Sequence, residues 1–116
     1  MIAYITGATS GIGRAIALKL AEKQYHLIIS GRREDLLKTL ETEVKAKFGC
    51  EVLSLVYDVR NRKQTVEINT HLPDTWKQID VLVNNAGLAV GLNPIQDGDM
   101  DDWERMIDTN IKGLLY

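Results

Sequence analysis

Three glycines near the start of the chain have the spacing of a phosphate-binding turn. Residues 6–13 read TGATSGIG, and Gly7, Gly11 and Gly13 stand between an apolar run and an alternating apolar pattern. Glycines let the backbone turn tightly, let a ligand approach the main chain and let a helix pack closely on a strand. The free N–H groups of the following helix would attract a pyrophosphate. The alternative is an ordinary strand-to-helix turn, but the flanking strand and helix favour a dinucleotide site.

Two adjacent cations after the second apolar run indicate which dinucleotide the turn would serve. A fold that prefers NAD usually has Asp or Glu there, about 20 residues past the glycines, to bind the ribose 2′-hydroxyl. This chain has Gly31, Arg32 and Arg33 instead. Two guanidiniums can bind a 2′-phosphate through charge-assisted hydrogen bonds. We therefore expect NADP rather than NAD, with the Ser10 hydroxyl facing the same phosphate; the alternative is a solvated arginine pair.

Polar residues also end the third and fourth apolar runs. Asp58 follows the third run, and the sequence NNAG at 84–87 follows the fourth. The carboxyl ends of parallel strands meet at one edge of a sheet, where ligands bind. There Asp58 could accept a hydrogen bond from an adenine amino group, unless it is only a turn aspartate. The amides at 84–87 could tie neighbouring strand ends together, and Gly87 would leave room for a cofactor.

Alternating strand and helix patterns position these residues. The apolar spacing predicts strands at 2–5, 26–30, 52–59 and 79–83, and helices beginning near residues 12, 34, 63 and 99. No hairpin signal interrupts them, so the strands should be parallel and joined by right-handed crossovers. The predicted fold class is α/β: a Rossmann-type doubly wound parallel sheet with strand order 3-2-1-4. Residues 1–116 would form one domain, truncated after the fourth strand and the helix that follows it.

The last predicted helix, residues 99–115, has more apolar positions than a surface helix needs. Asp99 suits its N-cap, with Asp102 three residues later in the manner of a capping box. A stripe of about 100° is enough to pack against a sheet. We therefore expect a second partner beyond the sheet. The apolar positions, which spread over about half of the circumference at 100° per residue, are Trp103, Met106, Ile107, Ile111, Leu114 and Leu115.

Composition and charge argue against several classes of function. The formal net charge is −2 and no basic cluster exceeds Arg32–Arg33, so nucleic-acid binding has little support. No apolar run approaches the roughly 18 residues of a membrane span, and no secretion signal is recognisable. The single Cys50 cannot form an internal disulfide, which fits a cytoplasmic protein. His26 and His71 have no companions at metal-ligand spacing, so we expect no metal site.

Taken in order, the motifs resemble those of the short-chain dehydrogenase/reductase family over the whole chain. The motifs are the glycine turn at 6–13, Asp58-Val59, NNAG at 84–87 and Asn110 in the last helix. The stretches 31–33, 58–62, 84–88 and 103–113 further resemble the bacterial NADP-dependent 3-hydroxy acid dehydrogenases. Those enzymes act on serine, L-allo-threonine and related acids.

The resemblance implies a role for each matching residue. It implies that Thr6 braces the glycine turn and that Asn110 holds a water in a proton relay to a lysine. It implies a small hydroxy-acid or carbonyl substrate, and a dimer or tetramer for the full-length enzyme. It also implies which residues contact each part of the cofactor. The pyrophosphate would contact Gly7, Gly11, Ile12 and Gly13, and the 2′-phosphate would contact Arg32 and Arg33. Adenine would contact Asp58 and Val59, and the ribose would contact Asn84, Ala86 and Gly87.

One part of the family pattern is missing from these residues. The family's catalytic Ser, and its Tyr and Lys four residues apart, belong to later elements, and none of the 4 tyrosines here precedes a lysine at that spacing. Reduction of a carbonyl requires such a general acid, with a pKa lowered by a nearby cation. We therefore expect the cofactor-binding N-terminal half of a dehydrogenase, inactive by itself. The alternatives are a non-enzymatic NADP-binding module and an inactive fragment.

Overall fold

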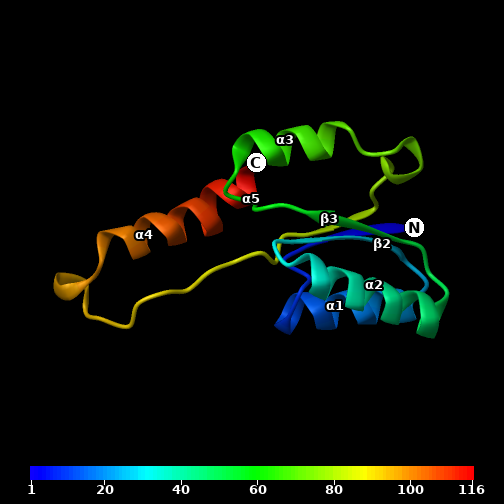
Figure 1. Ribbon diagram of the computed structural model, residues 1–116, viewed down its shortest axis with the longest axis horizontal. Helices are drawn as coiled ribbons and strands as arrows, with labels where there is room; N and C mark the ends of the chain where they lie inside the picture. Colours follow the sequence, from blue (N-terminus) through cyan, green and yellow to red (C-terminus); the bar gives the residue numbers. More distant parts are fainter.

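Figure 1 shows the computed structural model, which describes residues 1–116 as a parallel sheet with helices on both faces. The strands lie in the order β3-β2-β1-β4 and all neighbours are parallel. The predicted fold class and strand order are therefore confirmed. The strands are β1 (Ile2–Thr6), β2 (His26–Gly31), β3 (Val52–Val56) and β4 (Val81–Val83). The helices are α1 (Gly11–Glu22), α2 (Glu34–Phe48), α3 (Arg62–Thr70), α4 (Met100–Ile107) and α5 (Gly113–Leu115).

The core lies on both faces of β1 and β2. Strands of a parallel sheet are buried on both faces and read as continuous apolar runs, as residues 27–29 do here. Alternate side chains go to opposite faces, so Leu27 packs under α1 and α2, whereas Ile28 packs with Tyr4 and Leu72 on the α3 side. The main cluster also contains fully buried residues of α1 and α2, namely Ala17, Ala21, Leu37, Leu40 and Val44.

Two helix ends follow the signals predicted from the sequence, at Gly49 and Asp99, whereas the cap at Asn61 was not predicted. Gly49 ends α2 with a left-handed φ of 68°, which glycine adopts without strain. Asn61 begins α3 by accepting a hydrogen bond from the Gln64 amide at 3.0 Å. Asp99 caps α4 as predicted, by accepting from the amides of residues 101 and 102. The predicted capping box is not formed, because the Asp102 carboxylate pairs with Arg105 at 3.4 Å instead of returning to the Asp99 amide. No helix is both long enough and apolar enough to cross a membrane.

Two strands are shorter than the apolar runs predicted. Strand β3 ends at Val56 rather than residue 59, because its pairing with β2 ends where β2 itself ends, at Gly31. Strand β4 begins at Val81 rather than residue 79. Asp80 precedes the ladder, and its carboxylate accepts the Ile2 amide at 2.7 Å. Strand length is thus set by the neighbouring strand, which an apolar run alone does not reveal.

The helix predicted over residues 99–115 is confirmed from Met100 to Leu115, but it contains a π-helical turn that the sequence did not predict. Helix α4 passes into a π-helical turn at Asp108–Lys112 before the short α5. Figure 1 shows α4 projecting away from the sheet. The loop after β4 packs against it, since Gly98 lies against Trp103 and Gly91 against Asp102. Most of the apolar positions expected to meet a partner are exposed, from 36% at Trp103 to 74% at Leu115 in α5, whereas Met106 is half-buried. The second partner expected for this helix remains a prediction.

We predict that Leu40→Ala destabilises the fold far more than Thr39→Ala on the neighbouring, exposed position of α2. Leu40 is fully buried, so its truncation loses transfer free energy and leaves a cavity. We expect a loss of about 2–5 kcal/mol in the free energy of unfolding, measured by urea denaturation with an unchanged m-value. Equal, small losses for the two variants would contradict the assignment of Leu40 to the core.

Candidate functional site

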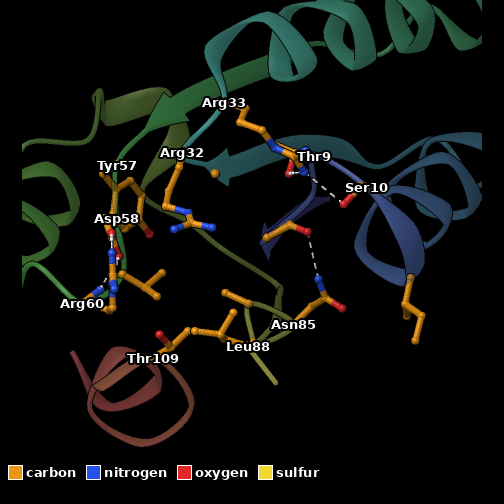
Figure 2. A pocket seen from close by; sticks show the side chains of 16 residues that line it. Thr9, Ser10, Arg32, Arg33, Tyr57, Asp58, Arg60, Asn85, Leu88 and Thr109 are labelled. Carbon is orange, nitrogen blue, oxygen red and sulfur yellow. Dashed lines mark hydrogen bonds and ion pairs between the residues drawn. The ribbon is translucent and has the colours of Figure 1, made fainter. Parts of the chain in front are cut away.

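A cleft of about 420 Å³ opens at the carboxyl edge of the sheet (Figure 2). Its walls come from segments that follow all four strands, together with the π turn beyond α4. This is the edge at which parallel α/β sheets bind ligands. Most of the predicted site residues line it, namely Gly7, Ser10, Ile12, Arg32, Arg33, Asp58, Val59, Ala86 and Gly87.

Four hydrogen bonds join the end of β1 to the segment after β4. The Thr6 hydroxyl accepts from the backbone amides of Asn85 at 3.1 Å and Ala86 at 3.0 Å. The Asn85 side-chain amide donates to the carbonyls of Thr6 and Gly7, both at 3.0 Å. Thr6 therefore lies behind the cleft wall, where it fixes the position of the residues that form the wall.

Two of the glycines are packed against this same junction. A Cβ on Gly7 would lie 2.8 Å from the Ala86 Cα, and Gly7 has a positive φ of 67°. A Cβ on Gly13 would collide with the Asn85 amide and the Gly7 carbonyl. Gly11 differs: its φ of 57° demands glycine, although nothing lies within 4 Å of a Cβ there. The turn thus has glycine at two positions for space and at a third for backbone conformation.

Arginine and hydroxyl groups gather beside the glycine turn. Figure 2 shows Arg33 reaching Thr9 and Ser10, to which its Nη2 donates at 3.0 Å and 3.2 Å, while Arg32 points into the cleft. Gly31 permits this approach, because a Cβ there would lie 2.5 Å from the Thr9 methyl carbon. The guanidinium of Arg33 is exposed and bonded to neutral hydroxyls, so it keeps its full charge for an anion.

Asp58, the acidic residue of the cleft lining, forms an ion pair with the neighbouring Arg60. Arg60 donates from Nε and Nη2 to the two Asp58 oxygens at 2.6–3.0 Å, and its backbone amide donates to Oδ1 at 3.0 Å. These bonds hold the pKa of the Asp58 carboxyl below its usual range and raise the pKa of Arg60. Asp58 is therefore an ionised, oriented acceptor whose charge is balanced locally.

Asn110 lies in the π turn and binds the loop after β4 with both polar atoms of its side chain. Its Nδ2 donates to the Leu88 carbonyl and its Oδ1 accepts from the Leu88 amide, each at 2.8 Å. Asn110 itself is exposed and does not line the cleft, whereas its neighbour Thr109 does. A π turn within a helix often marks a functional site.

Several predicted residues lie outside the cleft lining, and several lining residues were not predicted. The predicted residues outside the lining are Thr6, Gly11, Gly13, Asn84 and Asn110. The unpredicted lining residues are Thr9, Gly31, Tyr57, Arg60, Asn85, Leu88 and Thr109. Period-two alternation along β4 could have identified Asn85, because it continues the half-buried side of Val81 and Val83 whereas Asn84 is exposed. No sequence signal links Leu88 to Thr109.

We predict that Arg60→Gln lowers the free energy of unfolding by about 1 kcal/mol near neutral pH, and by less in acid. Because Arg60 depresses the folded pKa of Asp58, its stabilisation is present above the unfolded pKa of about 3.9 and is lost as pH falls through the folded value. Urea unfolding of both proteins over this pH range measures the difference. The control Arg62→Gln, at an exposed position, should show no such pH dependence; a difference for Arg60→Gln that persists in acid would contradict the assignment.

Comparison with known proteins gives matches over the whole chain. The sequence model for short chain dehydrogenases matches residues 1–116. The NADP-dependent 3-hydroxy acid dehydrogenase of Salmonella typhi is 48% identical over 116 residues, covering 100% of this chain and 45% of that protein. Sulfoacetaldehyde reductase 2 of Chromohalobacter salexigens is 46% identical over 114 residues, covering 98% of this chain and 44% of that protein.

A solved structure adds a direct comparison of folds. The closed form of serine dehydrogenase complexed with NADP⁺ matches with a TM-score of 0.89 and 43% identity, covering 100% of this chain and 45% of that one. The chain thus spans a little under half the length of the relatives it matches. The family match over all residues, on the strand order and glycine turn described above, shows that the chain belongs to the short-chain dehydrogenase family.

Proposed function

We propose that this chain holds NADP(H) for a short-chain oxidoreductase that transfers hydride between the cofactor and a small hydroxy acid or carbonyl compound. The observation that carries the proposal is the exposed Arg33 guanidinium, bonded to Thr9 and Ser10 beside the glycine turn. An NADP-dependent relative at 48% identity and a structural match complexed with NADP⁺ support the choice of cofactor.

The residues of the cleft fit such a dinucleotide. Residues 7 and 13 are glycines because a side chain at either position would collide with Ala86 or Asn85. In the proposal, the glycine turn leads into the backbone amides at the start of α1, which bind the pyrophosphate. The first turn of α1 has no acidic residue to oppose an anion. We place the 2′-phosphate at Arg32 and Arg33, adenine at Asp58 and Val59, and the ribose along Asn84, Ala86 and Gly87.

Asn84 and Asn110 have different roles in the proposed site. Asn84 is exposed outside the cleft lining, so it would reach the ribose only from the rim. Asn110 binds Leu88 through its side chain, so we assign it the positioning of the loop after β4. A water of the proton relay would therefore hydrogen-bond to the main chain near Asn110 rather than to the Asn110 side-chain amide.

The bound cofactor would supply the hydride, whereas the proton must come from a positioned acid. None of the 4 tyrosines of this chain precedes a lysine by four residues, and Tyr4 is buried against Tyr57 with its hydroxyl 2.6 Å away. Burial raises the pKa of Tyr4, which is the opposite of what a catalytic tyrosine needs. We therefore propose that these residues bind the cofactor but do not complete the reaction by themselves.

Two other parts of the proposal concern partners. The substrate class, a 3-hydroxy acid or related carbonyl, rests on the names of the relatives. The proposed homo-oligomer rests on the exposed apolar positions of α4 and α5, because a helix face of this kind usually packs against another surface.

We predict that Arg33→Ala weakens NADPH binding by at least tenfold and leaves NADH binding within about twofold. A hydrogen bond to a charged group contributes about 1.5–3 kcal/mol, and about 1.4 kcal/mol corresponds to a factor of ten. Titration calorimetry of the wild-type and variant chains with both dinucleotides measures the two affinities. Arg62→Ala is the matched control, since it removes an exposed cation outside the cleft. Equal losses for NADPH and NADH would contradict a 2′-phosphate contact.

We also predict that the 116-residue chain does not oxidise NADPH when mixed with small 3-oxo acids or aldehydes, because the general acid is missing. The NADPH absorbance should stay constant at enzyme concentrations that bind the cofactor fully. Measurable oxidation above the background rate would contradict the proposal that these residues bind the cofactor without completing the reaction. It would require a general acid among residues 1–116.

A further inference from the structure

The π turn after α4 contacts the cleft on two sides. On one side Asn110 binds Leu88, which lines the cleft. On the other side Gly113 faces Val59, and Val59 also lines the cleft. A Cβ on Gly113 would lie 2.8 Å from Val59 Cγ2, closer than real side chains approach, and 3.2 Å from Val59 Cβ, which is a tight contact. The backbone of Gly113 therefore packs directly on the Val59 side chain.

Space, rather than backbone conformation, requires glycine at residue 113. Its φ of −60° and ψ of −35° are ordinary helical values that any residue adopts. Its amide donates to the Asp108 carbonyl, which closes the π turn. Glycine in a helix costs about 1 kcal/mol in stability relative to alanine. The close packing on Val59 is the feature of the structure that offsets this cost.

We propose that Gly113 is a positioning residue that sets the location of Val59 at the adenine end of the cleft. The inference rests on the proposed function, since it takes Val59 to contact adenine. A methyl group at residue 113 would push Val59 toward the space that the base occupies. The size of residue 113, remote from the glycine turn and from the arginines, would thereby control the affinity for every adenine-bearing ligand of this site.

The test uses the variants Gly113→Ala, Val59→Ala and the double variant, with Leu115→Ala as control because Leu115 is 74% exposed in the same helix. Binding of NADPH, NADH and 2′,5′-ADP is measured by calorimetry, and thermal unfolding is measured in parallel. We expect Gly113→Ala to weaken all three ligands by about tenfold, the effect of overpacking by one methyl group. Inorganic pyrophosphate, which reaches only the glycine turn, should bind as it does to the wild-type chain.

The Val59→Ala background distinguishes positioning from general damage. There the additional Gly113→Ala change should alter the three affinities by less than about twofold, because the side chain it would displace is gone. If Gly113→Ala alone fails to fold, restoration of folding by the double variant, with the affinities of Val59→Ala, supports the inference equally.

Three results would overturn the inference. One is unchanged binding by Gly113→Ala, and another is an equal loss for inorganic pyrophosphate, which would indicate a purely structural role. The third is an undiminished effect of Gly113→Ala in the Val59→Ala background. If the wild-type chain itself bound neither NADPH nor 2′,5′-ADP, the proposed function would fail first, and the inference that rests on it would fall with it.

Discussion

The junction between the ends of β1 and β4 is the constraint on which the rest of the site depends. The Thr6 hydroxyl and the Asn85 amide contribute four hydrogen bonds that lock the glycine turn against the segment after β4. Gly7 and Gly13 have no space for a side chain because this junction lies against them. The junction thus fixes the backbone that leads into α1, whose first turn has no acidic residue to oppose a phosphate.

Charge in the cleft is arranged around this frame. Asp58 is the acidic member among the lining residues, and its carboxylate is bonded to Arg60. Arg32 and Arg33 therefore face the cleft without a free carboxylate to neutralise them. Arg33 is further oriented by the hydroxyls of Thr9 and Ser10, which are fixed by the glycine turn itself. One loop consequently positions both the pyrophosphate site and the cation proposed for the 2′-phosphate.

The sequence predicted those features of the fold that depend on residues close together in the chain. The strand order followed from alternation of strands and helices, and the end of α2 from Gly49. The differences arose where distant residues decide. Strand β3 stops because β2 stops, and the helix that follows Asp99 contains a π-helical turn at the residues where Asn110 binds Leu88. Asn84 was predicted from the motif, whereas the alternation along β4 points to Asn85, whose side chain binds the Thr6 carbonyl.

A crystal structure of the chain with NADP⁺ tests the central claim most directly, because it locates each group of the cofactor. We expect the pyrophosphate at the amides that begin α1, the 2′-phosphate in contact with Arg33 and the Ser10 hydroxyl, and adenine between Val59 and the Asp58–Arg60 pair. The hydrogen bonds between Thr6 and Asn85 should be unchanged. A 2′-phosphate in solvent, away from both arginines, or a dinucleotide outside this cleft would contradict the claim.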